Sequence, residues 1–534
     1  MAVQVNRRST ATRVQPVAFF KASTGIDDLS WNSGFHLLSS WAFRLQGIPV
    51  VYFACRAGMS RCVLGTYRDA PGKAPPCVTC IHQSRILYTG IPGGNITDGP
   101  AGDTSNPSGS PKSDPSRVYW FTFERDTELE GIIRKFSLEQ LSDFDHHGLP
   151  LGGLCLPGLR WILRRHHLID DESTRFLLRE YILSAWSIAG EFSKFIERTN
   201  PRAVLVFNGQ FFPEAVARFV ALKKGIRVIT HEVGLQPASA FFTDGEATAY
   251  PIRLPTDFEL NAEQNDKLDD YLQKRFQGRF SMAGIQFWPE MRGLDNAFLS
   301  KAARFKQIVP VFTNVIFDTS QPHANHVFTD MFAWLDLILE MIRTHPETLF
   351  VIRAHPDETR LRKESLETVQ AWVEDNGVNL LDNVIFLAPR EYLSSYELIH
   401  RSKFVMIYNS TIGLEASILG VPALCSGKAR FTQYETVFFP TSVEEQRRTI
   451  QEFLDAKSIN MPREHILNAR RFLYFQLFKS SLPFGDFLRP SVRTTQTRLR
   501  TFDIDSLIQA SSIRTVTSGV LNEEDFVMND SGDG

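Results

Sequence analysis

Short runs of apolar residues alternate with longer stretches of helical spacing through most of this chain. In the first half, runs rich in β-branched and aromatic residues predict strands. These runs cover residues 17–20, 48–53, 203–207 and 226–230. Helical periodicity falls between them, at residues 35–45, 171–198 and 213–224. The strands are apolar along their whole length, which is typical of parallel strands buried on both faces of a sheet.

The same alternation starts again near residue 308. Strands are predicted at residues 308–314, 348–354, 384–387, 404–407 and 422–425. Helices are predicted at residues 328–343, 362–374, 392–401 and 411–419. Strict alternation of buried strand and helix indicates a parallel sheet with right-handed crossovers. The sequence therefore predicts two doubly wound, Rossmann-like α/β domains that face each other across a cleft.

We place the first predicted domain at residues 1–300 and the second at residues 301–485. Residues 93–116 are so rich in Gly, Pro and Ser that they predict a disordered insertion. The charged segment 258–280 predicts a helix on the surface. Residues 486–534 are rich in Thr, Ser and Arg with weak periodicity, so we expect an extended or partly disordered tail.

Composition narrows the class of protein without identifying it. Hydrophobic residues make up 43% and charged residues 22% of the 534 residues, an ordinary balance for a globular protein. The chain has 58 Lys and Arg residues and 60 Asp and Glu residues, so it carries no excess of positive charge. We therefore exclude nucleic acid as a partner. No signal peptide and no long apolar run is evident, so we expect a cytoplasmic protein. Peripheral membrane contact stays compatible with the sequence.

Polar residues follow several of the predicted strands, where open parallel sheets bind ligands. In the first domain they are Asn208, Gln210, His231 and Glu232, and in the second they are Asn314, Asp318, His355, Asn409, Ser410 and Thr411.

The sharpest of these signals is the turn formed by Asn409, Ser410 and Thr411, which follows a predicted strand and opens a helix. Unpaired N–H groups at a helix start, with small hydroxyl side chains, suit an anion such as a diphosphate. Glu415 lies one helical turn further, where a carboxylate could accept hydrogen bonds from ribose hydroxyls. Simple capping is the alternative for the hydroxyls, but it explains neither Glu415 nor Gly413.

His355 and Pro356 end another predicted strand, directly after Arg353 and Ala354. A histidine there could donate a hydrogen bond to a phosphate or protonate a leaving group. The alternative is a loop histidine with a structural partner.

The segment Glu415-Ala416-x-x-x-Gly420-x-Pro422 resembles the donor-binding helix of glycosyltransferases of the GT-B fold. Together with His355-Pro356 and the 409–411 turn, it is most similar to the capsule polysaccharide and Kdo-transferase-like branch and to the bacterial sialyltransferases. The resemblance covers residues 305–440 and is only architectural over residues 17–245.

This resemblance implies a transferase that moves a sugar from a nucleotide-sugar donor to a cell-surface glycan or glycolipid acceptor. It implies that His355 and the Ser410-Thr411 turn bind donor phosphate, that Glu415 lies near the ribose, and that Arg353 and Asn409 also belong to the donor-binding site. Asn314 and Asp318 should line the same cleft, and Asn208 and Gln210 should lie on the acceptor side.

The resemblance also implies that the acceptor base comes from the first domain, where His231 and Glu232, which follow a predicted strand, are the candidates. A core or capping role is an equal alternative for both. No Asp-x-Asp stands where a metal-dependent GT-A enzyme would need it, so we expect no cofactor and no metal in catalysis.

Four cysteines crowd into one short stretch, at Cys55, Cys62, Cys77 and Cys80. Four thiolates can close a tetrahedral structural zinc site. A Cys-x-x-Cys pair is also compatible with two buried thiols or a redox pair, so both readings stay open.

Two other classes of function fit the same fold. One is a sugar-nucleotide epimerase or a polyol-phosphate transferase, which sugar-transfer assays would distinguish. The other is a non-catalytic protein that binds sugar nucleotides without turnover.

Overall fold

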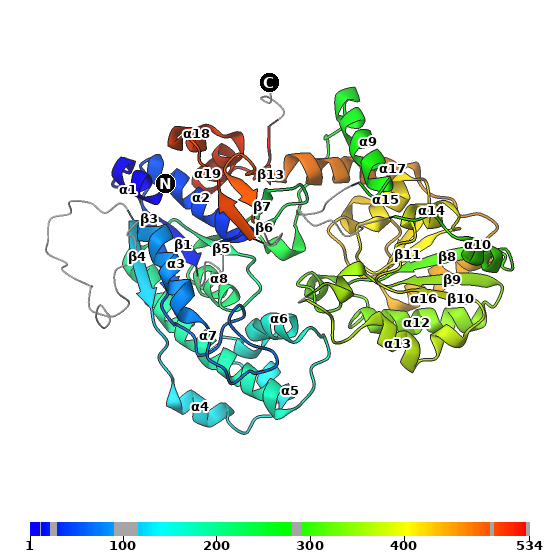
Figure 1. Cartoon of the computed structure of the whole chain (residues 1–534), viewed down its shortest axis with the longest axis horizontal. Helices are drawn as coiled ribbons and strands as arrows, with labels where there is room; N and C mark the ends of the chain where they lie inside the picture. The colour runs from blue at the N-terminus through cyan, green and yellow to red at the C-terminus, as the bar shows by residue number, and fades with distance from the viewer. Residues whose placement is uncertain are drawn as a thin grey trace. The chain divides into compact units, whose positions relative to one another are not determined.

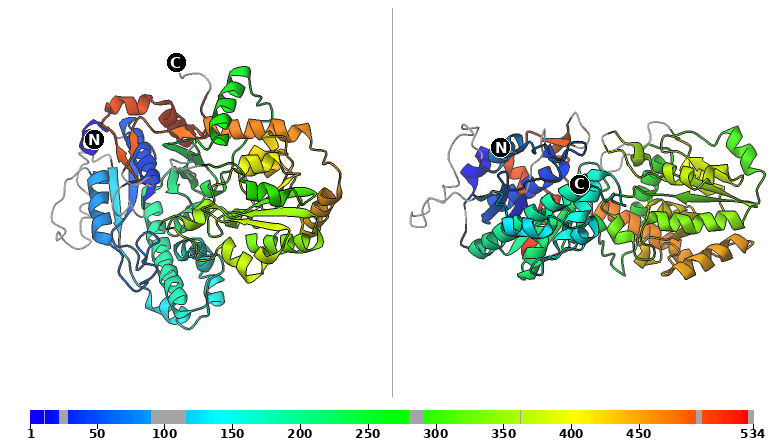
Figure 2. Two further views of the ribbon diagram at one scale, coloured as in Figure 1. Left: turned by 45° about the vertical axis from the view of Figure 1, so that its right-hand side comes forward. Right: turned by 90° about the horizontal axis from the view of Figure 1, so that it is seen from below.

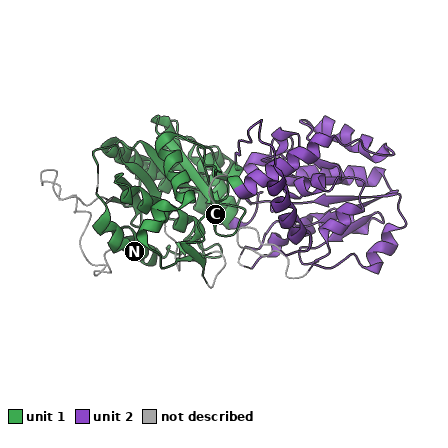
Figure 3. Ribbon diagram, turned by 90° about the horizontal axis from the view of Figure 1, so that it is seen from above, with its two compact units in different colours: residues 1–162, 168–250, 479–534 green, residues 163–167, 251–478 purple. Residues whose placement is uncertain are grey.

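The chain divides into two units in the computed structural model, and each is described by itself (Figure 3). The structure describes residues 1–10, 12–21, 29–89, 116–279, 291–361, 363–491 and 496–529. Unit 1 comprises residues 1–162, 168–250 and 479–534, and unit 2 comprises residues 163–167 and 251–478.

Unit 1 is built on a seven-stranded sheet with the order β13-β7-β6-β5-β1-β3-β4. Strands β4, β3, β1, β5 and β6 are parallel, whereas β7 and β13 are antiparallel to their neighbours. The strands are β1 (Val17–Lys21), β3 (Val50–Cys55), β4 (Ser116–Phe121), β5 (Ala203–Phe207), β6 (Arg227–Val233), β7 (Ser239–Thr243) and β13 (Leu482–Pro483). A small antiparallel sheet adds β2 (Leu29–Ser30), β14 (Leu488–Pro490) and β15 (Gln496–Leu499).

Helices cover both faces of the large sheet in unit 1 (Figure 1). Phe19 of β1 packs against Phe43 of α2, whereas its neighbour Phe20 packs against Phe192 of α7. This alternation places α2 and α7 on opposite faces. The helices are α1 (Ala2–Arg8), α2 (Trp31–Leu45), α3 (Cys77–Thr89), α4 (Thr127–Ile133), α5 (Leu138–Ser142), α6 (Leu151–Leu163), α7 (Glu172–Thr199), α8 (Glu214–Lys223), α18 (Ile504–Gln509) and α19 (Ser511–Asn522).

Unit 2 contains a five-stranded parallel sheet with the order β10-β9-β8-β11-β12. Its strands are β8 (Gln307–Phe312), β9 (Thr348–Arg353), β10 (Val384–Leu387), β11 (Val405–Ile407) and β12 (Ala423–Cys425). All six residues of β9 are buried, as expected for a central strand of a covered parallel sheet.

Helices flank the sheet of unit 2 on both sides, with α12 and α13 on one side and α14 and α15 on the other (Figures 1 and 2). They are α9 (Ala262–Phe276), α10 (Asn296–Ala302), α11 (Gln321–Ala324), α12 (Met331–Thr344), α13 (Val369–Asp375), α14 (Ser395–His400), α15 (Ile412–Ile418), α16 (Val443–Asp455) and α17 (Arg463–Tyr474). The two doubly wound α/β sheets predicted from the sequence are thus present.

The boundaries differ from the prediction at two places. The chain crosses from unit 1 to unit 2 after Tyr250 and not near residue 300. Residues 486–534 were predicted to be extended or partly disordered, but the described residues among them include β14, β15, α18 and α19 and belong to unit 1. Buried Ile513, Val516 and Val520 of α19 join the core of unit 1, which explains why this segment folds. Residues 93–115 of the predicted insertion lie outside the described residues, and Ser116 begins β4.

The described residues contain no helix that combines the length and apolar character needed to cross a membrane.

Candidate functional site

The strand order of unit 2 reverses between β8 and β11. The chain moves outward from β8 to β9 and β10, then returns to the other side of β8 with β11 and β12. Connections on opposite sides of the sheet leave a crevice at the carboxyl ends of the two strands, where such folds bind ligands. Thr313 follows β8 at this crevice, and Ser410 follows β11.

A cavity of about 100 Å³ lies there, within unit 2. The polar residues that line it are Arg275, Thr313, Arg353, His355, Ser395, Tyr396, Ser410, Thr411 and Glu415. Five of the residues predicted to bind the donor therefore lie around one cavity, although they come from β9, from the turn after it, from the turn that leads into α15 and from α15 itself. We call this cavity the strand-end pocket.

Glu415 is buried and paired. Its Oε1 accepts hydrogen bonds from Arg275, at 2.6 Å from Nη2 and 2.8 Å from Nε. The Tyr396 hydroxyl donates to Oε2 at 2.6 Å. These three bonds leave at most one lone pair, on Oε2, for a ribose hydroxyl. Contact between Glu415 and a ribose stays a prediction, but the structure also gives the carboxylate a second task, which is to hold Arg275.

Arg275 was missed by the sequence analysis, which placed its helix on the surface. Helix α9 is charged overall, but Gln264, Leu268, Leu272 and Arg275 are buried along one face. This spacing of buried positions is the signal that could have identified Arg275. Burial lowers the pKa of Arg275, but the carboxylate of Glu415 more than offsets it, so the pKa rises well above its usual value.

Arg353 is buried at the end of β9 and supplies a second guanidinium. Its Nη1 donates to the Leu393 carbonyl at 2.6 Å, and its Nη2 donates to the Glu391 carbonyl at 3.2 Å. Burial lowers the pKa of Arg353 to about 10, so the group is charged at neutral pH. These two bonds to neutral oxygens fix the guanidinium in position at the strand-end pocket.

His355 is half-buried and caps the 3-10 turn Pro356–Thr359. Its Nδ1 accepts a hydrogen bond from the Asp357 N–H at 3.2 Å. Burial lowers the pKa of His355, while Asp357 and Asp318 raise it less. A neutral ring whose Nδ1 accepts carries its proton on Nε2. His355 is therefore set up as a hydrogen-bond donor at the pocket, as a phosphate-binding histidine would be.

The 409–411 turn brings two hydroxyl groups to the pocket, from Ser410 and Thr411. Neither is engaged as a strong cap: Thr411 makes no side-chain cap bond, and Ser410 Oγ is 3.5 Å from the Ile412 nitrogen. The capping alternative therefore explains little here. Helix α15 has only seven residues, so its dipole is modest and the side chains carry most of the polarity.

The remaining residues predicted for the donor side lie beside the pocket and do not line it. The side-chain oxygen of Asn314 accepts from the Asn409 N–H at 3.4 Å, which ties the ends of β8 and β11 together. Asp318 accepts hydrogen bonds from the backbone and hydroxyl of Ser320 in the loop after β8.

In unit 1 the structure corrects the placement of the candidate base His231. We predicted that His231 and Glu232 follow a strand, but β6 continues to Val233 because it pairs with β7. His231 is fully buried, and its Nε2 lies 3.0 Å from Nδ1 of His36. Burial, with a smaller effect of Lys21, lowers the pKa of His231 to about 3. His231 is a core residue and a poor base.

Glu232 is half-buried and lies in a polar cluster at the ends of the unit 1 strands. It accepts hydrogen bonds from the side chains of Asn32, at 2.6 Å, and Asn208, at 3.3 Å. Asn208 itself has a positive φ of 61° and accepts bonds from the Gln210 and Phe211 N–H groups. This cluster lies near the strand-order reversal between β1 and β5 of unit 1.

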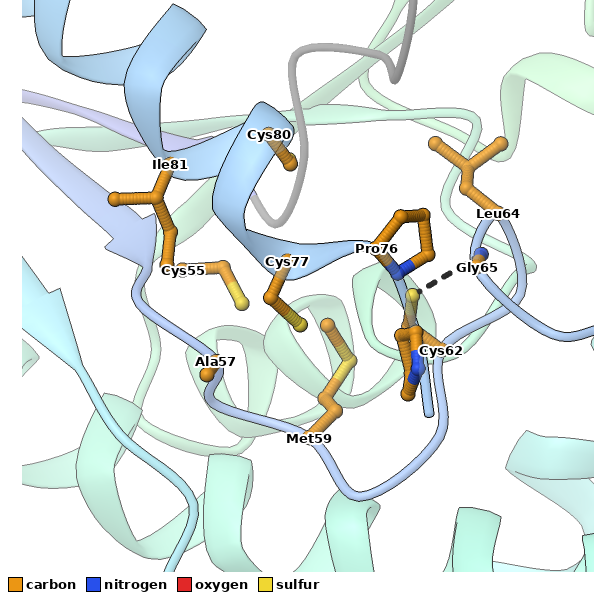
Figure 4. Close-up of a pocket in the computed structure, with 11 residues that line it drawn as sticks. Cys55, Ala57, Met59, Cys62, Leu64, Gly65, Pro76, Cys77, Cys80 and Ile81 are labelled. Atoms are coloured by element: carbon orange, nitrogen blue, oxygen red, sulfur yellow. Dashed lines mark hydrogen bonds between the residues drawn. The ribbon is translucent and has the colours of Figure 1, made fainter. Parts of the chain in front are cut away.

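The four clustered cysteines line one small apolar pocket (Figure 4). Their sulfurs do not converge, because no three of them lie within 4.8 Å of one another among the described residues. Burial raises the pKa of the Cys62 thiol to about 12 and also raises the pKa of the Cys55 thiol, so both stay protonated. Zinc binding by Cys55, Cys62, Cys77 and Cys80 stays a prediction, which metal analysis of protein purified without chelator tests.

Residues 261–434 match a family described as capsule polysaccharide biosynthesis protein. The match covers about a third of the chain and includes β8 to β12, with the whole strand-end pocket. It confirms, for this segment, the resemblance predicted from the 409–422 region and His355-Pro356. No curated protein matches the sequence.

Solved structures similar to this chain include two enzymes from Thermosulfurimonas dismutans. The KpsC β-Kdo 2,4-transferase is 13% identical with a TM-score of 0.36, and 58% of this chain covers 87% of that one. The KpsC β-Kdo 2,7-transferase is 14% identical with a TM-score of 0.33, and the coverages are 60% and 87%. The UDP-GlcNAc 2-epimerase from Neisseria meningitidis, solved with UDP-GlcNAc, is 18% identical with a TM-score of 0.24, and the coverages are 55% and 80%.

Proposed function

We propose that this protein is a glycosyltransferase of capsule or related polysaccharide biosynthesis. In this proposal it moves a sugar from a nucleotide-sugar donor to a glycan or glycolipid acceptor, without a metal in the chemical step. The observation that carries the proposal is the strand-end pocket, which lies at the switch point of unit 2 inside the segment that matches the capsule polysaccharide biosynthesis family.

The charges around the pocket suit a diphosphate or phosphate leaving group. Among the described lining residues, two guanidinium groups and one carboxylate are charged, from Arg275, Arg353 and Glu415. The balance is one positive charge in a partly enclosed site, where electrostatic interactions are stronger than in water. The Nε2–H of His355 and the hydroxyls of Ser410 and Thr411 add neutral donors.

These groups supply a mechanism for the donor half of the reaction. Negative charge grows on the leaving phosphate as the glycosidic bond breaks. Donors held in place before the reaction stabilise that charge without reorganisation. In this proposal Arg353 and His355 contact the leaving phosphate, and the 410–411 hydroxyls bind the phosphate nearer the nucleoside. Glu415 and Tyr396 position Arg275.

For the acceptor half we propose Glu232 as the base. His231 is excluded by its burial and its low pKa, whereas Glu232 is half-buried and oriented by Asn32 and Asn208. A carboxylate can accept the proton of an attacking hydroxyl as the new glycosidic bond forms.

A transfer assay with a sugar-labelled donor tests the proposal. Candidate donors are CMP, UDP, GDP and ADP sugars, and candidate acceptors are oligosaccharides and glycolipids. We expect label in the acceptor and one free nucleotide for each sugar transferred. Isomerisation of the donor sugar without an acceptor would instead support an epimerase. Binding without any turnover would support a non-catalytic protein.

A further inference from the structure

Five residues from the first half of the chain, 163–167, belong to unit 2, although they comprise the last residue of α6 and the start of the loop that leads to α7. They pack against the segment 366–367 and the loop after β8. The Leu366 N–H donates to the Arg164 carbonyl at 2.9 Å, and the guanidinium of Arg164 lies 5.2 Å from the centre of the Phe317 ring. The sequence pattern gave no signal for this placement.

The segment brings two imidazoles to a buried carboxylate. His166, His167 and Asp330 each offer a ligand atom, and these atoms all lie within 4.8 Å of one another. Among the residues that the structure describes, no other group of three His, Cys, Asp or Glu side chains meets this condition. Imidazole nitrogen with carboxylate oxygen is a ligand set typical of zinc and related transition metals, and it is a poor one for Mg²⁺ or Ca²⁺.

Glu367 is not one of the three ligand residues, but it contacts both histidines. Its Oε1 is 2.5 Å from Nδ1 of His167, and its Oε2 accepts from the N–H groups of His166 and His167 at 2.8 and 3.1 Å. A carboxylate on one imidazole nitrogen fixes the tautomer and aims the other nitrogen at a metal. The other nitrogen, Nε2, lies 3.3 Å from Asp330 Oδ2.

The side chain of Asp330 is fixed in position because it caps helix α12. Its Oδ1 caps α12 by accepting from the N–H groups of Phe332 and Ala333, at 2.7 and 3.1 Å. Oδ2 receives the Thr329 hydroxyl and faces His167. The carboxylate is therefore oriented by a rigid element, and the exposed His167 leaves a path for an ion from solvent.

We propose that His166, His167 and Asp330 bind one divalent transition-metal ion of the zinc type, with Glu367 as the supporting carboxylate. The ion ties segment 163–167 to the start of α12 in unit 2. This role is structural, and none of the proposed ligands lines the strand-end pocket. The alternative is an ion-pair cluster in which a protonated His167 bridges Asp330 and Glu367 without a metal.

Titration of the metal-stripped full chain with Zn²⁺ and with Co²⁺, followed by calorimetry and by absorption, separates these readings. We expect the wild type to bind one equivalent that shows no thiolate-to-cobalt charge-transfer band. His167→Ala, His166→Ala and Asp330→Asn should each lose that equivalent, and asparagine keeps the oxygen that caps α12. Glu367→Gln should weaken binding about 10- to 100-fold, as the loss of a supporting carboxylate does.

The adjacent pair His146 and His147 in unit 1 gives a matched control, because these imidazoles are outside the ligand group. The double variant His146→Ala/His147→Ala should bind the metal as the wild type does. Melting of each metal-free variant shows that it folds. The proposal is overturned if the wild type binds no ion, if the Co²⁺ that the ligand variants lose is one that shows the thiolate band, or if the ligand variants bind as tightly as the control.

Discussion

The guanidinium of Arg275 lies 2.6 Å from the carboxylate of Glu415, and the two residues are 140 positions apart in the sequence. The side chains are only 9% and 2% exposed. The pair joins α9 to α15 at the wall of the strand-end pocket. The position of the Arg275 guanidinium at the pocket therefore depends on the fold of unit 2.

Replacing Glu415 by alanine should destabilise unit 2, because Arg275 would remain buried without its counter-ion. Removing one partner of a buried pair typically costs about 3–5 kcal/mol. Denaturant unfolding of the variant measures this loss. Lys274→Ala on the same helix is the control, because it breaks the exposed pair with Asp270 and should cost less than about 1 kcal/mol. Equal stability of the Glu415 variant and the wild type would show that the pair does not form.

Replacing His355 should reduce turnover more than stability. Both His355→Ala and His355→Asn remove the Nε2–H, and losing one such donor typically lowers the rate by about 10²–10³. Asparagine can still cap the 3-10 turn at Asp357, so it should retain the stability of the wild type. Steady-state transfer rates and melting curves of the two variants give the comparison. If His355→Asn transfers sugar at the wild-type rate, the histidine is only a cap.

The buried histidines of unit 1 predict a pH dependence of stability. Burial lowers the pKa of both His36 and His231, the latter to about 3. Below about pH 6.5 the unfolded chain binds protons at these positions and the folded chain does not. The free energy of unfolding should therefore fall on acidification, by about 1.4 kcal/mol per pH unit for each histidine.

Glu214 acts in the opposite direction, since burial raises its pKa from 4.5 to about 7. A comparison with His231→Phe isolates the histidine, because both proteins contain Glu214. Denaturant unfolding from about pH 6.5 to about pH 5 should give a shallower slope for the variant. Identical slopes would mean that His231 titrates normally in the folded protein.

The alternation of buried strands and helices was readable from the sequence because apolar runs fill both faces of each sheet. It located β1, β3, β5 and β6 in unit 1 and all five strands of unit 2 to within a few residues. Helix α19 was not predicted, since its Ser, Thr and β-branched residues have low helix propensity. Packing of its buried Ile513 and Val516 in the unit 1 core overrides that preference.

The sequence predicted only part of the candidate site, because some of its residues are placed by long-range contacts. The local sequence pattern locates the ends of strands and the start of α15, and so it predicted five residues that do lie around one pocket. They are Arg353, His355, Ser410, Thr411 and Glu415. Arg275 and His167 reach their positions through long-range contacts with residues on other elements. No local pattern specifies such pairs. His231 was misplaced because the antiparallel partner β7, which extends β6, was not anticipated.

Binding of nucleotide sugars to the strand-end pocket tests the central claim most directly. Thermal unfolding should be followed with CMP, UDP, GDP and ADP sugars, for the wild type and for the double variant Ser410→Ala/Thr411→Val. We predict that at least one of these donors stabilises the wild type, by about 2.7 kcal/mol at 100 times its dissociation constant. The double variant should melt like the wild type without ligand and respond weakly to that donor. An unresponsive wild type, or an equal response from the double variant, would contradict the account.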